Sequence, residues 1–179
     1  MSKRFIYAAA LTIGAGLLGL SIATYAVAAG GKQMVKSDQI IGYQETPGVW
    51  STGTGSFKAE IDDDAQVITF ELTYSGLSAP ALVSHIHFGN RFTAGGVSAF
   101  LCGDTKPPCP PGTTTEATVT GTIMPSDVIG PAAQGIAPGQ FDRLVKAIRD
   151  GMTYANIHTS NFPAGEIRAQ INDRNQRQP

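Results

Sequence analysis

The sequence predicts an all-β fold of antiparallel strands with one helix, and three stretches support this prediction. Apolar and polar residues alternate through residues 154–171 and again through residues 56–74, and each stretch has turn-forming residues in its middle. Apolar residues recur at the helical positions i, i+3, i+4 and i+7 in residues 141–148. Two hairpins and one amphipathic helix are therefore expected.

Residues 154–171 predict the hairpin around which the rest of the chain is organised. Residues 160–165 contain a proline that fixes φ and a glycine that can take positive φ, so a turn is expected there. One face of the hairpin is polar and gathers His158, Glu166 and Arg168. The other face is apolar and consists of Ala155, Ile157, Ile167, Ala169 and Ile171.

A second hairpin is predicted from residues 56–61 and 67–74, which alternate cleanly on either side of three aspartates. Consecutive aspartates also suit calcium binding, but residues 62–64 lack the glycine and the distal glutamate of an EF-hand loop. A solvated hairpin tip is therefore favoured. Further strands are expected at residues 39–44, 82–88, 97–101 and 114–123.

The predicted helix of residues 141–148 is bounded by turn residues. Pro138 and Gly139 precede it, and Gly151 is placed to end it in a left-handed conformation. The helix is expected to cross over one edge or end of the sheet and to return the chain to the closing hairpin.

Residues 1–28 have the pattern of a secretory signal. Lys3 and Arg4 precede an uncharged apolar run, and residues 26–28 (Ala-Val-Ala) form a signal-peptidase site. A retained membrane anchor is the alternative, which the three glycines within the run disfavour. An exported protein, periplasmic or extracellular, is therefore predicted.

The remaining chain has the length of one domain. A flexible tail is expected at residues 29–37, a single domain at residues 38–171 and a polar tail at residues 172–179. Loss of the signal moves the formal net charge from −1 to −3. A mildly acidic chain without a basic block gives no reason to expect nucleic acid or anionic lipid as a partner, or a stable membrane anchor after cleavage.

The two cysteines, Cys102 and Cys109, enclose a stretch rich in proline and glycine. In an exported protein they are expected to form a disulfide bond that fixes one exposed loop. A metal site or redox pair made of these thiols is the alternative.

Three spaced motifs, taken together, resemble the CHRD domain, named for chordin. The closing motif lies at residues 156–171, the opening strand at residues 42–47, and a central His-x-His motif at residues 85–89. The resemblance covers residues 38–171 and implies a β-sandwich of immunoglobulin-like or superoxide-dismutase-like character. It implies no settled biochemical activity.

All three histidines of the chain lie in these motifs. His85 and His87 share one face of a strand, and a neighbouring strand that carries His158 would complete a three-imidazole set. Such a set suits copper or zinc, with water or Glu166 as a fourth ligand. The alternative is that the histidines are hydrogen-bonded structural residues. Copper–zinc superoxide dismutase also has such a strand, but its two-metal site needs more histidines than this chain contains.

The other polar residues of the motifs are predicted to be structural anchors. Glu166 and Arg168 lie two apart on one strand and suit an ion pair, with Glu45 as a second partner for Arg168. Asn156 belongs to the same set. The chain has no Gly-x-Ser-x-Gly motif, and no catalytic residue is predicted.

Two functions remain open at the level of sequence. The first is an extracytoplasmic binding or structural module that recognises a protein, glycan or matrix ligand through loops 90–96 and 103–112. The second is a mononuclear copper or zinc protein. A binding or structural role is favoured over catalysis.

Overall fold

The computed structural model describes residues 31–37 and 39–172. The predicted signal sequence and the C-terminal tail beyond Asn172 lie outside the described residues. The strands are β1 (Lys32–Lys36), β2 (Ile40–Ile41), β3 (Thr54–Asp62), β4 (Val67–Ser75), β5 (Ala81–Phe88), β6 (Gly96–Cys102), β7 (Ala117–Ile123), β8 (Thr153–Thr159) and β9 (Ile167–Ile171). The helical elements are α1 (Phe141–Arg149) and the 3₁₀ turns η1 (Gly42–Gln44), η2 (Pro125–Asp127) and η3 (Ala132–Gln134).

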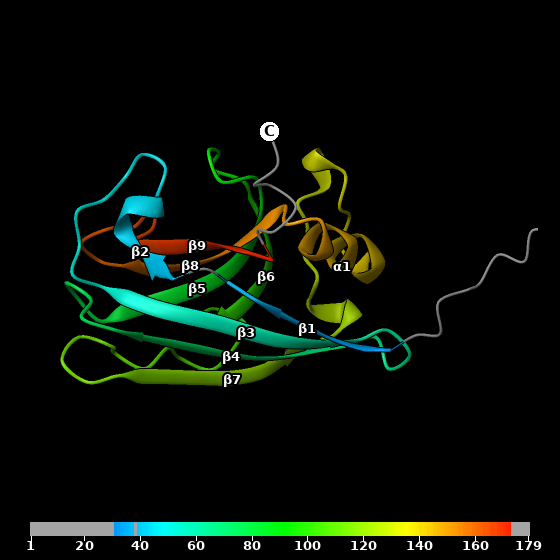
Figure 1. The fold of residues 1–179 in the computed structure, drawn as a ribbon, viewed down its shortest axis with the longest axis horizontal. Helices are drawn as coiled ribbons and strands as arrows, with labels where there is room; N and C mark the ends of the chain where they lie inside the picture. The colour runs from blue at the N-terminus through cyan, green and yellow to red at the C-terminus, as the bar shows by residue number, and fades with distance from the viewer. Residues whose placement is uncertain (1–30, 38, 173–179) are drawn as a thin grey trace, which may run out of the picture.

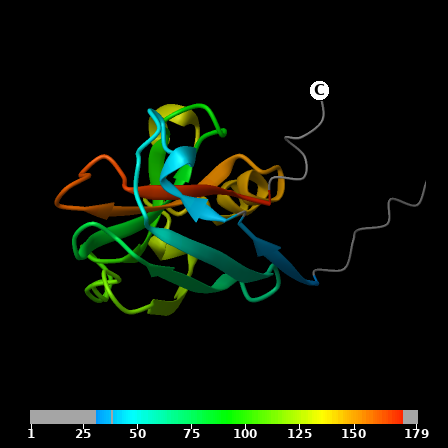
Figure 2. The ribbon, with the colours of Figure 1, turned by 60° about the vertical axis from the view of Figure 1, so that its left-hand side comes forward.

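The strands form one antiparallel sheet in the order β6-β5-β8-β9-β2-β3-β4-β7, and β1 pairs with β3 outside this path. The sheet curves until it is nearly closed like a barrel, so that the closing hairpin lies over β3 and β4 (Figures 1 and 2). The predicted all-β antiparallel class with a single α-helix is confirmed for the described residues. The immunoglobulin-like or superoxide-dismutase-like sandwich subtype stays a prediction.

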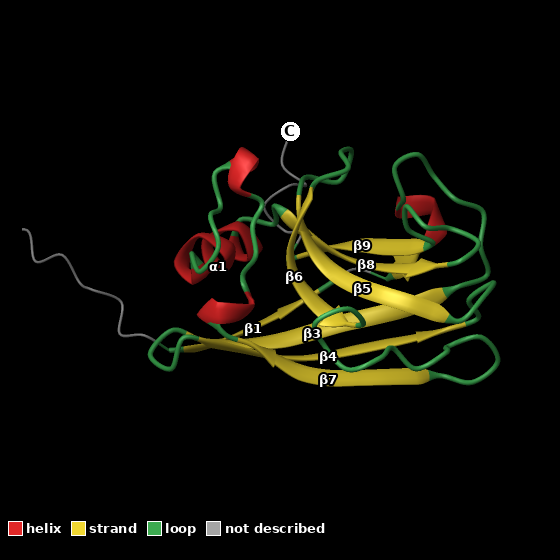
Figure 3. Cartoon of the chain, turned by 180° about the vertical axis from the view of Figure 1, so that it is seen from behind, coloured by secondary structure: helices red, strands yellow, loops and turns green. Residues whose placement is uncertain are grey.

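The hydrophobic core fills the concave side of this sheet. Phe57 of β3 and Phe70 of β4 stack with ring centroids 6.1 Å apart, and isoleucines from β2, β5, β8 and β9 close the opposite side. Helix α1 covers one end of the sheet, as predicted (Figure 3). Its apolar stripe is buried and consists of Phe141, Leu144, Val145, Ala147 and Ile148. Gly151 follows the helix with φ of 69°.

Residues 29–37 were predicted to be a flexible tail, and this is wrong for residues 32–36. These residues form β1, which pairs with β3 from Lys58 to Asp62. The segment lacks a full apolar face, and Val35 is its one fully buried residue. Backbone pairing explains the strand, because β2 covers only the first two residues of β3 and leaves the rest of that edge open to β1.

Two loops behave as the sequence predicts. At the β3–β4 tip, the Asp62 carboxylate accepts the backbone N–H of Ala65 at 2.9 Å, which is a turn-forming role. Cys102, at the end of β6, is bonded to Cys109, so the predicted disulfide is confirmed. No helix in the described ranges is long and apolar enough to cross a membrane.

Candidate metal centre

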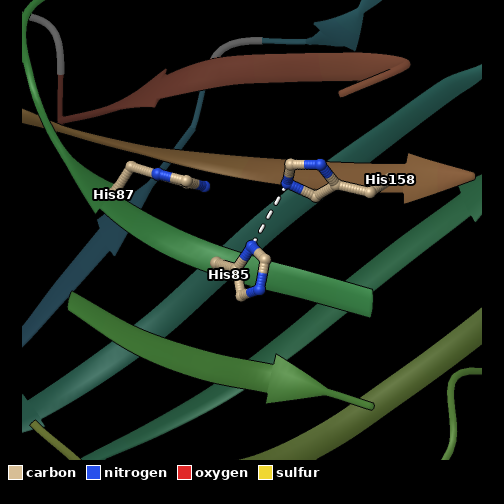
Figure 4. A group of neighbouring side chains, drawn as sticks. All are labelled: His85, His87 and His158. Carbon is tan, nitrogen blue, oxygen red and sulfur yellow. Dashed lines mark hydrogen bonds between the residues drawn. The ribbon is translucent and has the colours of Figure 1, made fainter. Parts of the chain in front are cut away.

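Strands β5 and β8 are neighbours, and their pairing brings the three histidines together. His85 and His87 alternate along β5, so both project from its outer face, opposite to the buried Ile86. In the ladder His85 faces Asn156 and His87 faces Tyr154, and His158 lies two residues beyond Asn156 on the same face of β8. Figure 4 shows the three rings facing a common space beside these strands.

The three rings converge, which strand periodicity alone could not establish. Nδ1 of His85 lies 3.1 Å from Nε2 of His158. One nitrogen from each ring can be chosen so that all three lie within 4.8 Å of one another. The side chains are largely shielded from solvent, with exposed fractions of 8% for His85, 8% for His87 and 7% for His158.

Backbone carbonyls hold two of the rings in a defined tautomer. Nδ1 of His87 donates to the carbonyl of Gly95 at 2.9 Å, and Nδ1 of His158 donates to the carbonyl of Pro163 at 3.0 Å. Because a carbonyl can only accept, both Nε2 atoms carry lone pairs. Nε2 of His158 accepts from His85, whereas the buried Nε2 of His87 has no hydrogen-bond partner in the described structure.

The environment keeps all three rings neutral. Burial, with the neighbouring His158 and His87, lowers the pKa of His85 to about 3. Burial also lowers the pKa of His87 to about 4 and lowers the pKa of His158. Neutral imidazole is the form that binds metal ions, so no proton has to be removed from a charged ring at neutral pH.

Aromatic rings flank the cluster. Phe100 of β6 meets His85 edge-on with a centroid separation of 4.7 Å. Tyr154 stacks on His87 at 4.8 Å with nearly parallel planes, and the guanidinium carbon of Arg168 lies 4.2 Å from the centroid of the Tyr154 ring. Tyr154 was not among the predicted site residues, although its period-2 relation to His158 would have placed it on this face.

Glu166 does not belong to the cluster, so the structure gives no support to its predicted role as a fourth ligand. The backbone N–H of Glu166 donates to the carbonyl of Ile157, and Ile157 is also the ladder partner of Ile167. Two consecutive residues, Glu166 and Ile167, therefore face one residue of β8. This is the pattern of a β-bulge, which turns the Glu166 side chain away from the histidine face.

The Glu166 carboxylate is instead bound by Ser51, Ser78 and Thr159, with separations of 2.7 to 2.9 Å. Burial would raise the pKa of this carboxyl, but these hydrogen bonds outweigh burial and lower it. The predicted ion pair between Glu166 and Arg168 is not among the interactions of the described residues.

Arg168 fastens two segments over the outer face of β8 and β9. Its guanidinium donates to the carbonyls of Gln44, Arg91 and Thr93 and to the hydroxyl of Thr46. The first and last of these residues lie in segment 42–50, and the other two in segment 89–96. Sequence reasoning placed Arg168 among the structural anchors but could not foresee that its partners are the backbones of two distant loops.

Glu45 and Asn156 complete this cover. The Asn156 amide donates to the Glu45 carboxyl and to the carbonyl of Ile167. Burial raises the pKa of Glu45 to about 7, against the opposing effects of Arg168 and Asn156. Gly165, with φ of 128°, allows this close packing, because a Cβ atom there would lie 2.7 Å from both side chains.

Comparison with known proteins identifies the domain. A family model described as the CHRD domain matches residues 37–171. The search of curated proteins gives no match. The search of solved structures also gives none.

Proposed function

The chain belongs to the CHRD domain family, and we propose that this member is a mononuclear copper- or zinc-binding module that acts in the periplasm or the extracellular medium. The observation that carries the proposal is the convergence of three neutral, buried imidazoles. The disulfide between Cys102 and Cys109 supports a location outside the cytoplasm, since such bonds persist in oxidising compartments.

The nitrogen positions suit a shared ion. Two nitrogens bound to one tetrahedral ion at about 2.0–2.1 Å are about 3.3 Å apart. His85 Nδ1 and His158 Nε2 already lie at 3.1 Å. His87 has to approach these two by a side-chain rotation, since the three nitrogens span up to 4.8 Å.

The surrounding hydrogen bonds also suit a metal ligand set. The carbonyls of Gly95 and Pro163 occupy the nitrogens of His87 and His158 that would not bind the ion, and thereby orient the rings. Binding through Nδ1 of His85 requires that its proton sit on Nε2. Metal binding would give the unpartnered Nε2 of His87 a partner, and a buried acceptor without a partner costs free energy.

A second candidate function is recognition of an extracytoplasmic protein, glycan or matrix ligand. It is favoured by exposed aromatic side chains on the segments that cover the histidine face: Tyr43 is 72% exposed, Trp50 75% and Phe92 80%. Large amphipathic rings of this kind are common in binding surfaces. The predicted binding loop 90–96 contains Phe92. The other predicted loop, 103–112, supplies no such aromatic residue.

Metal titration of single-alanine variants tests the primary proposal. Replacement of His85, His87 or His158 is expected to weaken copper or zinc binding at least about 100-fold, since each removes one of three ligands. His87→Ala removes the Nε2 atom that has no partner in the fold, together with a single hydrogen bond from Nδ1 to the carbonyl of Gly95. Thr118→Ala, on the exposed face of β7, is the matched control and should bind as the wild type does.

Circular dichroism of each variant monitors the fold. A wild-type protein that takes up neither metal at micromolar concentration would remove the metal-binding proposal and leave the recognition function.

A further inference from the structure

We propose that the histidine centre is selective for monovalent copper, Cu(I), over Cu(II) and Zn(II). This inference rests on the proposed metal-binding function and names the ion that the site takes. Three features of the site support it: the charge of the ligands, the charge around them, and the number of ligands.

The ligands carry no negative charge. Among the histidine, cysteine and carboxylate side chains of the described chain, the cluster contains only His85, His87 and His158. Both cysteines are consumed by the disulfide, and the Glu166 carboxylate is bound by hydroxyl and backbone donors on another face. A metal ion held by three neutral imidazoles therefore keeps its full formal charge.

The permanent charge that acts on His87 has the wrong sign for a divalent cation. The guanidinium of Arg168 packs on Tyr154, which in turn stacks on His87, so one aromatic ring separates this cation from a ligand. The Glu45 carboxyl, on the same side of the sheet, is bound by Asn156 and interacts electrostatically with Arg168. Because the desolvation cost of an ion rises with the square of its charge, a divalent ion here is penalised roughly four times as strongly as a monovalent one.

The coordination number points in the same direction. Zinc in proteins takes four ligands, so a zinc ion here would need a water molecule to complete the three histidines. Cu(I) is satisfied by three nitrogens in a plane, which is the number that the chain supplies. The aromatic rings of Phe100 and Tyr154, rather than further polar ligands, flank the histidines.

The test is the ratio of the Cu(II) to the Cu(I) dissociation constant, each measured on the folded protein by competition with a chelator of known affinity, Cu(I) under anaerobic conditions. The bound ion is expected to be held more tightly as Cu(I), and each tenfold preference raises the reduction potential of the bound copper by about 59 mV. Zinc is titrated in parallel and is expected to bind more weakly than either form of copper.

A matched pair of substitutions isolates the charge effect. Phe100→Glu introduces a carboxylate beside His85, and Phe100→Gln introduces a neutral side chain of the same shape. The glutamate variant is expected to lower the ratio at least tenfold relative to the glutamine variant, because an anion favours the divalent ion. The ratio measured on the wild type tests the selectivity even where neither variant folds.

The outcomes test the selectivity, the charge argument and the metal-binding function separately. A wild type that holds Cu(II) or Zn(II) as tightly as Cu(I), through the same histidines, overturns the selectivity but leaves the metal centre intact. Equal ratios in the two folded Phe100 variants overturn the charge argument. Failure of all three ions to bind overturns the proposed function itself.

Discussion

The two halves of the sheet differ in how their outer faces meet solvent. In β3 and β4 buried residues alternate with exposed or half-buried ones, and in β7 exposed residues alternate with buried or half-buried ones, so one face packs on the core and the other is wet. In β8 and β9 every residue is buried. The inner faces of both halves are apolar, and the difference lies in the outer face of the closing hairpin, which is polar and nevertheless covered.

The covered outer face of β8 and β9 costs free energy that the stability of the fold does not require. A covered polar face must satisfy each donor and acceptor, whereas a wet face leaves that task to water. Arg168, Asn156 and Gln170 on this face all donate to backbone carbonyls, so most of the cost is offset. The Nε2 atom of His87, on the neighbouring strand β5, has no partner, and it lies at the proposed metal centre. The other buried side-chain atoms without a partner in the described residues are the hydroxyls of Ser98 and Thr153.

The largest expected effect comes from removing the arginine that covers the outer face. Arg168→Met should lower the free energy of unfolding by about 3–5 kcal/mol, because the carbonyls of Gln44, Arg91 and Thr93 lose a charged donor. Lys58→Met, on the wet half, is the control. Its ion pair with Glu71 is exposed, and a change below about 1 kcal/mol is expected. Similar losses in urea unfolding for both variants would show that the two outer faces are energetically alike.

A smaller effect is expected from Glu45→Gln, and it depends on pH. The folded pKa of about 7 lies above the ordinary value of 4.5, so the contribution of Glu45 to stability is complete below about pH 4.5 and is lost as pH rises through about 7. The free energy of unfolding of the wild type, relative to the variant, should therefore fall by about 3 kcal/mol between pH 4.5 and pH 8.

Urea unfolding of both proteins across this range measures the difference, and the histidines, which both share, cancel. Parallel curves would mean that folding leaves the pKa of Glu45 unchanged, so that Arg168 and Asn156 offset its burial fully.

The smallest effect is expected from removing the disulfide bond, which starts at the last residue of β6. The double variant Cys102→Ala/Cys109→Ala opens a ring with a sequence separation of 7, for which chain entropy accounts for about 2.5 kcal/mol. Thermal unfolding should show this loss while copper binding is kept, because the bond fixes a loop and not the histidine face. Reductant should lower the stability of the wild type and not of the variant. Loss of metal binding in the folded variant would extend the role of the disulfide to the site.

Periodicity predicted what depends on neighbours in sequence. The alternation around Phe57 and Ile157 marked the hairpins, and the spacing from Phe141 to Ile148 marked the helix, because burial of one face dictates these patterns. It also placed His85 and His87 on one face.

Other features depend on contacts between distant segments and leave no local pattern. The strand at residues 32–36 forms because an edge of β3 is open to it. The bulge at Glu166 redirects a side chain that strict alternation assigns to the histidine face. The carbonyl partners of Arg168 are backbone groups, which any residue type supplies, so no sequence signal could have named them.

The strand order also sets when the histidine centre can form. β8 and β9 come last in the described chain, yet they lie between β5 and β2 in the middle of the sheet. While the chain is being synthesised, the earlier strands can form hairpins, but the sheet stays in two separate pieces until residues 153–171 arrive. His158 is 73 positions beyond His85, so the emerging polypeptide offers only a His-x-His pair, a weaker ligand set than the finished three. At the proposed centre, tight metal capture would thereby be postponed until the last strands are in place, and full loading would be a property of the completed fold.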